Sequence, residues 1–233
     1  MKKLALIPAI ALIGALASPV PAFAAEQNER QEIERVEKAV SIRAGGELRL
    51  KNFSGRVTIT GSARADVSIR AVRRASRERL DHIKLEVRET ASGVSIEANK
   101  KDDNWREQNN NVVETEFDIQ VPQDVKLDVD VFSSDIRVSG VNGQQELHTF
   151  SGNIEVTDAL GSVDAETFSG DIDLKLAQGA GGRVEFDSFS GALQADAGMT
   201  TRSASRRRTS GTIGSGGSND YNFKTFSGDV RIR

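Results

Sequence analysis

The sequence predicts an all-β fold: a parallel β-helix or β-solenoid-like stack of coils, each about 18–20 residues long. It also predicts an inserted cap of antiparallel strands near the N-terminus. Three observations carry these predictions. A Phe-Ser-Gly motif recurs along the chain, apolar and polar residues alternate on both sides of each copy, and longer alternating stretches interrupt the repeat after its first copy.

The repeated motif is a Phe followed by Ser and, in most copies, by Gly. Its copies begin at Phe53, Phe132, Phe150, Phe168, Phe189 and Phe226. A degraded copy begins at Thr209, and from Phe132 onward successive anchors are 17–21 residues apart. A period of this size is typical of a solenoid, in which each repeat is one turn and stacking on its neighbours supplies the core.

Each motif is flanked by two short alternating segments. Val163 and Ala165 precede one copy and Ile172 and Leu174 follow it, with polar residues between them. Alternation with a period of two indicates a strand with one apolar face. If the coils stack in register, equivalent residues such as Ile136, Ile154 and Ile172 form one column.

The direction of the Phe side chains depends on whether the chain bends before them. If the preceding strand continues straight, Phe150 and Phe168 point outward; if it bends, the rings turn inward and stack at a corner. An exposed row of Phe would form a large apolar patch, which proteins rarely carry without a partner. We therefore expect the inward stack. The Gly of the motif is expected to adopt a positive φ, with Ser134 as the exception.

The first 24 residues have the pattern of a secretory signal. A basic start is followed by an apolar run from Leu4 to Ala17 and by Ala22-Phe23-Ala24, which is typical of a cleavage site. We expect cleavage before Ala25, no transmembrane segment after it, and a periplasmic or cell-surface/extracellular location beyond the inner membrane. The chain has no cysteine for a disulfide or lipid attachment.

Four segments are expected in total. Residues 1–24 are the signal peptide, 25–44 a charged leader, 45–121 the first coil with the inserted strand region, and 122–233 the solenoid repeats. The leader is interpreted as either a short helix or a disordered segment. Within the insertion, strands are expected near residues 67–71, 83–87, 94–98 and 117–121. Helical turns are expected within 73–81, and a polar loop over 100–111.

The order of these features resembles the bacterial putative-adhesin family of secreted β-strand-repeat proteins, a family of unknown function. The resemblance rests on Gly45-Gly46-x-Leu48-x-Leu50, the inserted strands, Val121-Pro122 and the tandem Ser-Gly-Asp-Ile coils. It covers about residues 45–233. It implies a β-helix-like stack without known catalysis, and it supplies no established binding residues.

The residues that follow the motif form a possible ladder of oxygen atoms. Asp135, Asn153, Asp171 and Asp229 would lie about 5 Å apart on stacked coils, and Ca²⁺ prefers oxygen ligands. Ala192 interrupts the series, so we expect solvated outer-face residues and neither a metal nor a cofactor. The two histidines, His82 and His148, form no cluster with cysteine, and His148 is expected to point outward.

No catalytic motif stands out. Gly-x-Ser-x-Gly is absent from the sequence, and a Ser-Gly pair that recurs in most copies of the motif is the opposite of a unique nucleophile. We expect no enzymatic activity. An alternative remains open, in which acids on the outer face form the active site of a carbohydrate-active β-helix enzyme that cleaves envelope or extracellular polysaccharide.

One basic cluster interrupts the weakest repeat, within residues 198–217. Its members are Arg202, Arg206, Arg207 and Arg208. They are expected to lie on a mobile loop, either as contacts for an anionic partner or as solvated charges that protect an exposed strand edge. The net charge of −3 becomes −5 once Lys2 and Lys3 leave with the signal, which argues against nucleic-acid binding.

The leading hypothesis is therefore a non-enzymatic secreted cell-envelope protein, an adhesin-like β-repeat binding module of unknown ligand. Its expected partner is an anionic envelope polymer or a surface protein. A structural envelope accessory without a ligand is a third interpretation. The oligomeric state is left open.

Overall fold

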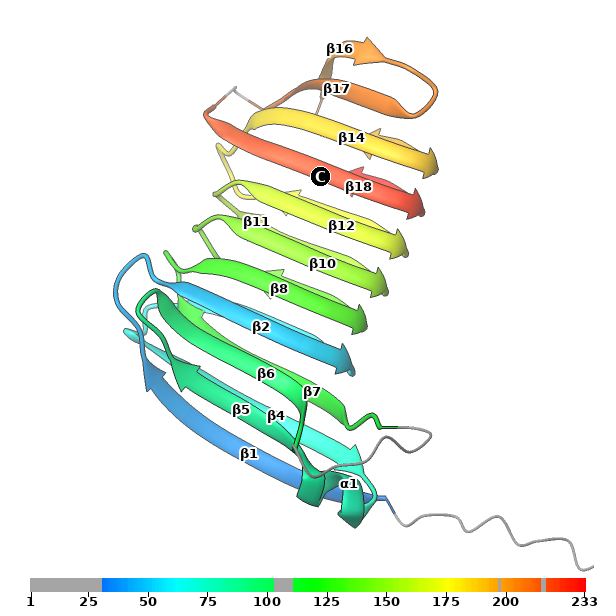
Figure 1. The fold of residues 1–233 in the computed structure, drawn as a ribbon. Helices are drawn as coiled ribbons and strands as arrows, with labels where there is room; N and C mark the ends of the chain where they lie inside the picture. The colour runs from blue at the N-terminus through cyan, green and yellow to red at the C-terminus, as the bar shows by residue number, and fades with distance from the viewer. Residues whose placement is uncertain (1–30, 103–110, 197, 215–216) are drawn as a thin grey trace, which may run out of the picture.

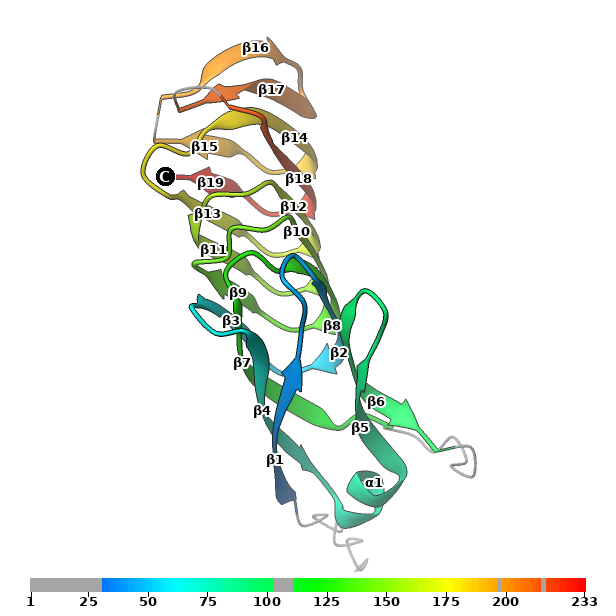
Figure 2. The same cartoon turned by 90° about the vertical axis from the view of Figure 1, so that its left-hand side faces the viewer.

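The computed structural model describes residues 31–102, 111–196, 198–214 and 217–233 (Figure 1). Over these residues, two large mixed β-sheets enclose one long apolar core, with a small second cluster at Ala75, Leu80, Ile83 and Val113, which confirms the predicted all-β class. Figure 2 shows the two sheets as facing layers. The predicted signal at 1–24, residues 25–30 of the predicted leader and most of the predicted polar loop lie outside the described residues.

Sheet A has nine strands and sheet B has ten. In spatial order, sheet A consists of β1 (Glu32–Ser41), β4 (Asp66–Ala75), β7 (Glu114–Pro122), β3 (Val57–Ser62), β9 (Ile136–Ser139), β11 (Ile154–Ala159), β13 (Ile172–Leu176), β19 (Val230–Ile232) and β15 (Leu193–Ala195). Sheet B consists of β16 (Thr200–Ala204), β17 (Arg208–Ile213), β14 (Gly182–Ser190), β18 (Asn219–Ser227), β12 (Val163–Ser169), β10 (Gln145–Ser151), β8 (Lys126–Ser133), β2 (Glu47–Ser54), β6 (Gly93–Lys101) and β5 (Ile83–Glu89). A short helix, α1 (Arg77–His82), lies near the end formed by β1 and β5 (Figures 1 and 2).

Each regular coil consists of one strand of sheet B, a Phe-Ser corner and one strand of sheet A. In sheet B, Leu147 pairs in parallel with Val129 on one side and with Ala165 on the other. In sheet A, Ile154 pairs in the same way with Ile136 and Ile172, so these three residues form the expected column. Equivalent apolar side chains therefore lie over one another in the core, and each fully buried one contributes about 1.5–3 kcal/mol.

The Phe side chains point outward, so the predicted inward turn is wrong. The six motif rings are 41–55% exposed, whereas Thr149, directly before Phe150, is buried. The strand continues straight through the Thr-Phe step, and successive side chains alternate between its two faces. The predicted stacking is correct, because the exposed rings stack on one another from coil to coil.

The corner glycines have the expected positive φ at Gly55, Gly152, Gly170 and Gly228, but not at Gly191. Close approach of the neighbouring coil adds a second constraint. A Cβ atom on Gly152 would lie 2.1 Å from the carbonyl oxygen of Ser134. Glycine is therefore needed at this corner both for its backbone conformation and for the spacing of the coils.

The N-terminal segment differs from both predicted alternatives, because the described part of the leader is a strand. β1 pairs antiparallel with β4 over its whole length and forms the edge of sheet A. The Arg73 side chain is buried and is bonded to the Glu34 carboxylate and the Ile83 carbonyl oxygen. These bonds tie the charged strand to the end of the core.

The inserted region combines antiparallel and parallel pairing. The strands expected near residues 67–71, 83–87, 94–98 and 117–121 are present as β4, β5, β6 and β7, and the predicted helical turns are present as α1. β4 and β7 are antiparallel, as are β5 and β6. However, β6 continues the stack in parallel with β2, and β7 does so with β3. The insertion therefore extends both sheets; sheet B ends with the β5–β6 hairpin, and sheet A ends with β1 beside β4.

The last coils do not stack in the order of the sequence. The coil of β18 and β19 lies between the coil of β12 and β13 and that of β14 and β15. Beyond β14, residues 200–213 form the antiparallel hairpin of β16 and β17, and not the mobile loop predicted there. The degraded motif runs opposite to the regular coils, because Gly211 pairs antiparallel with Val184.

Among the described residues, no helix has the length and apolar character needed to span a membrane.

Phe223 and Phe226 provide a matched test of the two Phe environments, because they lie three residues apart on β18. Phe223 is buried and Phe226 is 45% exposed. Phe223→Ala is expected to lower the free energy of unfolding by about 3–5 kcal/mol, because it leaves a cavity in the core. Phe226→Ala should cost about 1 kcal/mol, mainly from lost stacking. Urea denaturation measures both values, and equal losses would contradict this description of the coil.

Candidate functional site

The most prominent surface feature is a row of six stacked Phe rings along the outer corner of sheet B. In spatial order the row is Phe53, Phe132, Phe150, Phe168, Phe226 and Phe189. Neighbouring ring centroids are 4.6–4.9 Å apart and the rings are nearly parallel, so the row extends over about 24 Å. Because each inner ring covers the faces of its neighbours, the row presents mainly ring edges to solvent.

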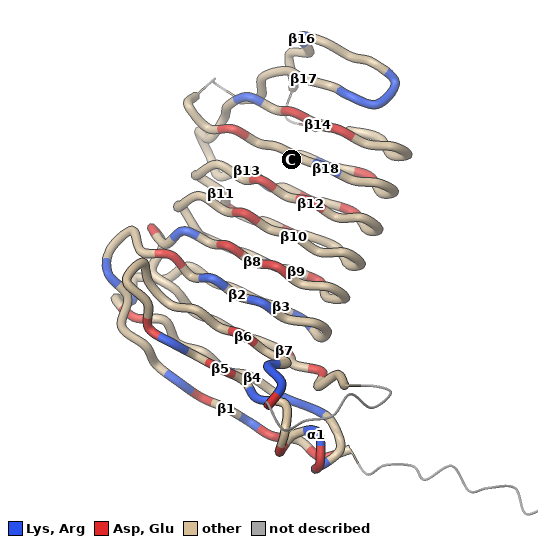
Figure 3. The backbone as a smooth tube through the Cα atoms, viewed as in Figure 1, with Lys and Arg blue, Asp and Glu red and all other residues tan. Residues whose placement is uncertain are grey.

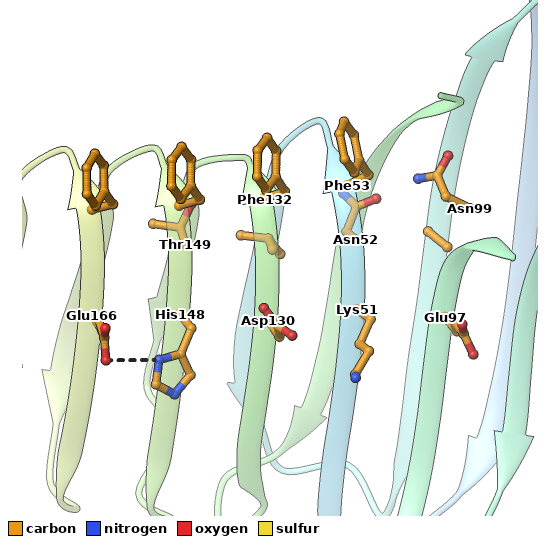
Figure 4. Close-up of a pocket in the computed structure, with 14 residues that line it drawn as sticks. Lys51, Asn52, Phe53, Glu97, Asn99, Asp130, Phe132, His148, Thr149 and Glu166 are labelled. Atoms are coloured by element: carbon orange, nitrogen blue, oxygen red, sulfur yellow. Dashed lines mark ion pairs between the residues drawn. The ribbon is translucent and has the colours of Figure 1, made fainter. Parts of the chain in front are cut away.

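A groove of about 610 Å³ lies along one half of this row (Figure 4). Its other wall is formed by the outward side chains two residues before each Phe on β2, β8, β10 and β12. These side chains are Lys51, Asp130, His148 and Glu166. The volume of the groove is within the range of small-molecule sites. The in-register coils therefore create a groove with an apolar edge and a charged wall.

The middle of the outer face of sheet B is acidic (Figure 3). The outward carboxylates on β8, β10 and β12 are those of Asp128, Asp130, Glu146, Asp164 and Glu166. Lys126 is the one Lys or Arg on these three strands. Glu166 also lies 3.8 Å from His148 Nδ1 and 3.8 Å from Lys224 Nζ. As expected, His148 points outward. A polyanion would be repelled from this part of the face.

Two amides have unpaired atoms at the β6 end of the groove. Asn52 is 6% exposed, and its Nδ2 donates to the carbonyl oxygens of Ser54 and Thr115, both at 3.0 Å. Its Oδ1 is buried without a hydrogen-bond partner. Asn99 Oδ1 accepts a bond from the Val113 N–H at 2.7 Å, and its buried Nδ2 has no partner. Figure 4 shows these two unpaired atoms pointing toward one another.

The predicted oxygen ladder exists, but its oxygens bind the backbone. The N–H of Asn153 donates to Asp135 Oδ1 at 3.0 Å, and that of Asp171 donates to Asn153 Oδ1 at 2.9 Å. Asp171 and Asp229 continue the series, which ends at the Ala192 N–H. Each side chain thus links its own coil to the next one. Within the described residues, no three His, Asp or Glu side chains are arranged to hold a metal ion.

The four predicted arginines lie on the β16–β17 hairpin but do not form one cluster with one role. The Arg207 guanidinium carbon is 4.5 Å from the Phe189 ring centroid and covers the last ring of the row. Arg208 donates to Glu185 Oε2 at 2.9 Å. Arg202 and Arg206 are exposed, and neither has an ion-pair partner among the described residues.

Sequence reasoning missed the groove and its two Asn residues. A signal was present in the repeat itself, because Asn52 directly precedes Phe53, where other copies have Thr149, Thr167 and Thr225. The importance of Asn99 could not be predicted in this way. It depends on β6 lying beside β2, which the spacing of the motif does not reveal.

The fold and its surface define a repeat-built all-β protein with an open lateral groove. Residues 124–233 match the family Toastrack DUF4097. The chain is also similar to a putative cell adhesion protein from Clostridium sporogenes, with a TM-score of 0.63 and 13% identity over 86% of this chain and 99% of that one. A putative adhesin from Bacteroides fragilis has a TM-score of 0.29 and 14% identity over 86% of this chain and 97% of that one.

The family match confirms the resemblance to a domain family of unknown function over residues 124–233. At 13% identity, the Clostridium sporogenes structure supports the fold alone. No curated protein shows significant similarity to the chain.

Substitutions at Asp171 test the structural role of the ladder. Asp171→Ala removes the acceptor for the Asp229 N–H and is expected to cost about 1 kcal/mol of unfolding free energy. Asp171→Asn keeps an oxygen in place, as Asn153 does naturally, and should be close to neutral. Thermal unfolding with and without millimolar Ca²⁺ measures both variants. Equal losses, or a large stabilisation of the wild type by Ca²⁺, would contradict a ladder that serves only the backbone.

Proposed function

We propose that this protein is a non-enzymatic, adhesin-like β-solenoid module of the cell envelope, and that the Phe row with its adjoining groove is its binding surface. The observation that carries the proposal is the row itself, with six rings that are 41–55% exposed. A contiguous apolar feature of this length on an otherwise polar face is typical of an interaction site.

The repeat architecture supports a binding role. Successive coils place equivalent side chains in straight rows, and the row of rings extends along a rigid sheet edge. Because the sheet edge is already ordered, little conformational entropy is lost there when a partner binds, which favours affinity. The name of the structurally similar putative cell adhesion protein, together with the secretory signal expected from the sequence, supports an envelope location.

The charges narrow the chemistry of the partner. The acidic middle of sheet B disfavours an anionic polymer on this face, so we propose that the component bound along the Phe row is uncharged or basic. An anionic envelope polymer would instead bind the β16–β17 hairpin, through Arg202 and Arg206. Arg207 and Arg208 already bind Phe189 and Glu185.

The double variant Phe150→Ser/Phe168→Ser tests the role of the row. It removes the two central rings and is expected to lower the fraction of protein bound to isolated native envelopes by roughly tenfold, as for central interface aromatics. Leu160→Ser is the matched control, because Leu160 is 46% exposed and lies outside the row. Equal binding by the two variants, both folded by circular dichroism, would remove the row from the binding surface.

The same incubations test the enzymatic alternative. Our proposal predicts that no reducing sugar ends or other glycan fragments are released from the envelopes. Release that is abolished by Asp130→Asn would instead favour a carbohydrate-active enzyme that uses the groove.

The hairpin has its own test. Arg202→Ala/Arg206→Ala is expected to lower retention on a polyanion such as dextran sulfate by severalfold and to reduce the dependence of retention on salt. Arg183→Ala, which removes an arginine from outside the hairpin, is the control. Retention that the double variant leaves unchanged would remove the hairpin from any role in binding anionic polymers.

A further inference from the structure

The Phe row has two end rings, and their outer faces differ. At one end, Arg207 covers Phe189. At the other end, Phe53 stacks on Phe132 at a centroid distance of 4.9 Å, and no other described aromatic or cationic side chain stacks on its second face. Figure 4 shows this second face directed across the groove toward Asn99. Phe53 is therefore the place in the row where a ligand can meet a ring face as well as ring edges.

The unpaired amide atoms lie on either side of the same position. Asn52 comes from β2 and Asn99 from β6, and both line the groove beside Phe53. Asn52 Oδ1 is an acceptor without a donor, and Asn99 Nδ2 is a donor without an acceptor. A buried polar group without a partner is rare and calls for a physical reason. One group that both donates and accepts would satisfy both atoms.

The two asparagines also replace the residues that the repeat would place there. In the other coils, a Thr such as Thr149 or Thr167 donates its hydroxyl to a backbone carbonyl oxygen. Asn52 Nδ2 makes the corresponding bonds, so its Oδ1 is an additional acceptor that packing of the coil does not require.

Asn99 occupies the β6 position that would extend the Phe row. Lys51 pairs with Glu97, so two residues further along each strand Asn99 corresponds to Phe53. Asn99 has a φ of +62°, and the pairing of β2 with β6 ends before it, at Lys51 and Glu97, where the groove begins. An Asn in place of the next Phe therefore ends the row and supplies a polar group at its end.

We propose that this end of the groove is a subsite for a neutral pyranose ring. The C–H face of the sugar stacks on the Phe53 ring face on which no described residue stacks, because the negative ring face attracts weakly positive C–H groups. A sugar hydroxyl donates to Asn52 Oδ1 and accepts from Asn99 Nδ2. The inference rests on the proposed binding function and assigns its ligand class at one place in the groove.

The neighbouring charges favour an uncharged ligand. Glu97 lies opposite Lys51 on the adjacent strand, and Asp130 follows on β8. Lys51 and Arg88, whose Nη2 lies 3.7 Å from Glu97 Oε2, balance these two carboxylates, so the subsite has no net charge to attract an ionised sugar. A guanidinium or ammonium group could stack on Phe53, but it has no acceptor to offer Asn99 Nδ2.

The test uses the mature full-length chain and a panel of methyl pyranosides of glucose, galactose, mannose and N-acetylglucosamine. Saturation-transfer NMR and titration are expected to detect millimolar binding of at least one sugar, with transfer strongest at the protons of its apolar face. Arginine methyl ester and glucuronic acid are the charged comparisons. Binding of arginine methyl ester in preference to every sugar, or no sugar binding at up to about 50 mM, would overturn the subsite.

Three substitutions locate the bound sugar. Asn52→Thr restores the residue of the other coils and removes the acceptor. Asn99→Asp keeps the acceptor for Val113 and removes the donor. Phe53→Leu removes the ring face. Each is expected to weaken sugar binding, by about threefold to tenfold for the polar pair and more for Phe53→Leu. Leu160→Ser, outside the row and the groove, should leave sugar affinity within about twofold.

The outcomes separate the subsite from the broader function. Equal loss with Leu160→Ser and Phe53→Leu would overturn the subsite, because Leu160 lies outside the groove. Envelope binding that depends on Phe150 and Phe168, without any pyranoside binding, would overturn the subsite and leave the proposed function standing. Sugar binding, combined with envelope binding that does not depend on the row, would overturn the proposed function and leave the subsite standing.

Discussion

Hydrogen bonding between coils in a fixed register is the constraint on which the rest of this structure depends. Once Leu147 lies opposite Val129 and Ala165, every equivalent residue of those coils must also lie in a row. The register therefore produces the buried isoleucine column, the outer Phe row and the oxygen ladder together. A residue type that recurs in every coil therefore forms a row, and any unfavourable exposure of that residue recurs with it. The row of exposed Phe rings is the clearest example.

The inward and outward rows depend on one another. Burial of Thr149 directly before Phe150 places the ring outside, and the Thr hydroxyl donates to the Ser134 carbonyl oxygen of the preceding coil. Turning the ring inward would expose that hydroxyl and disturb the register. The rings instead reduce their exposure by stacking, since each covers its neighbours at 4.6–4.9 Å.

The same relation explains what could be predicted from the sequence. Alternation around each motif correctly predicts the core residues and the column of Ile136, Ile154 and Ile172, because these depend only on local period and register. The inward Phe is wrong because the prediction counts the apolar area of an exposed row without the area that the stacked rings hide from solvent. The order of the last coils, the β16–β17 hairpin and the β1 strand depend on long-range pairing, which a motif period does not encode. The groove end was missed for the same reason, because Asn52 and Asn99 come from separate parts of the chain.

The placement of β18 between β12 and β14 has a consequence for the order of assembly. Residues 182–195 are synthesised before residues 219–232, yet they lie farther along the stack. When residues 182–195 have been synthesised, β18, which separates β14 from β12 in the finished stack, has not. β14 must therefore stay unpaired on that side or pair temporarily with β12. The hairpin of β16 and β17, which is synthesised before β18, can already pair with the other edge of β14. Its polar outer edge would shield one side of β14 until β18 is in place.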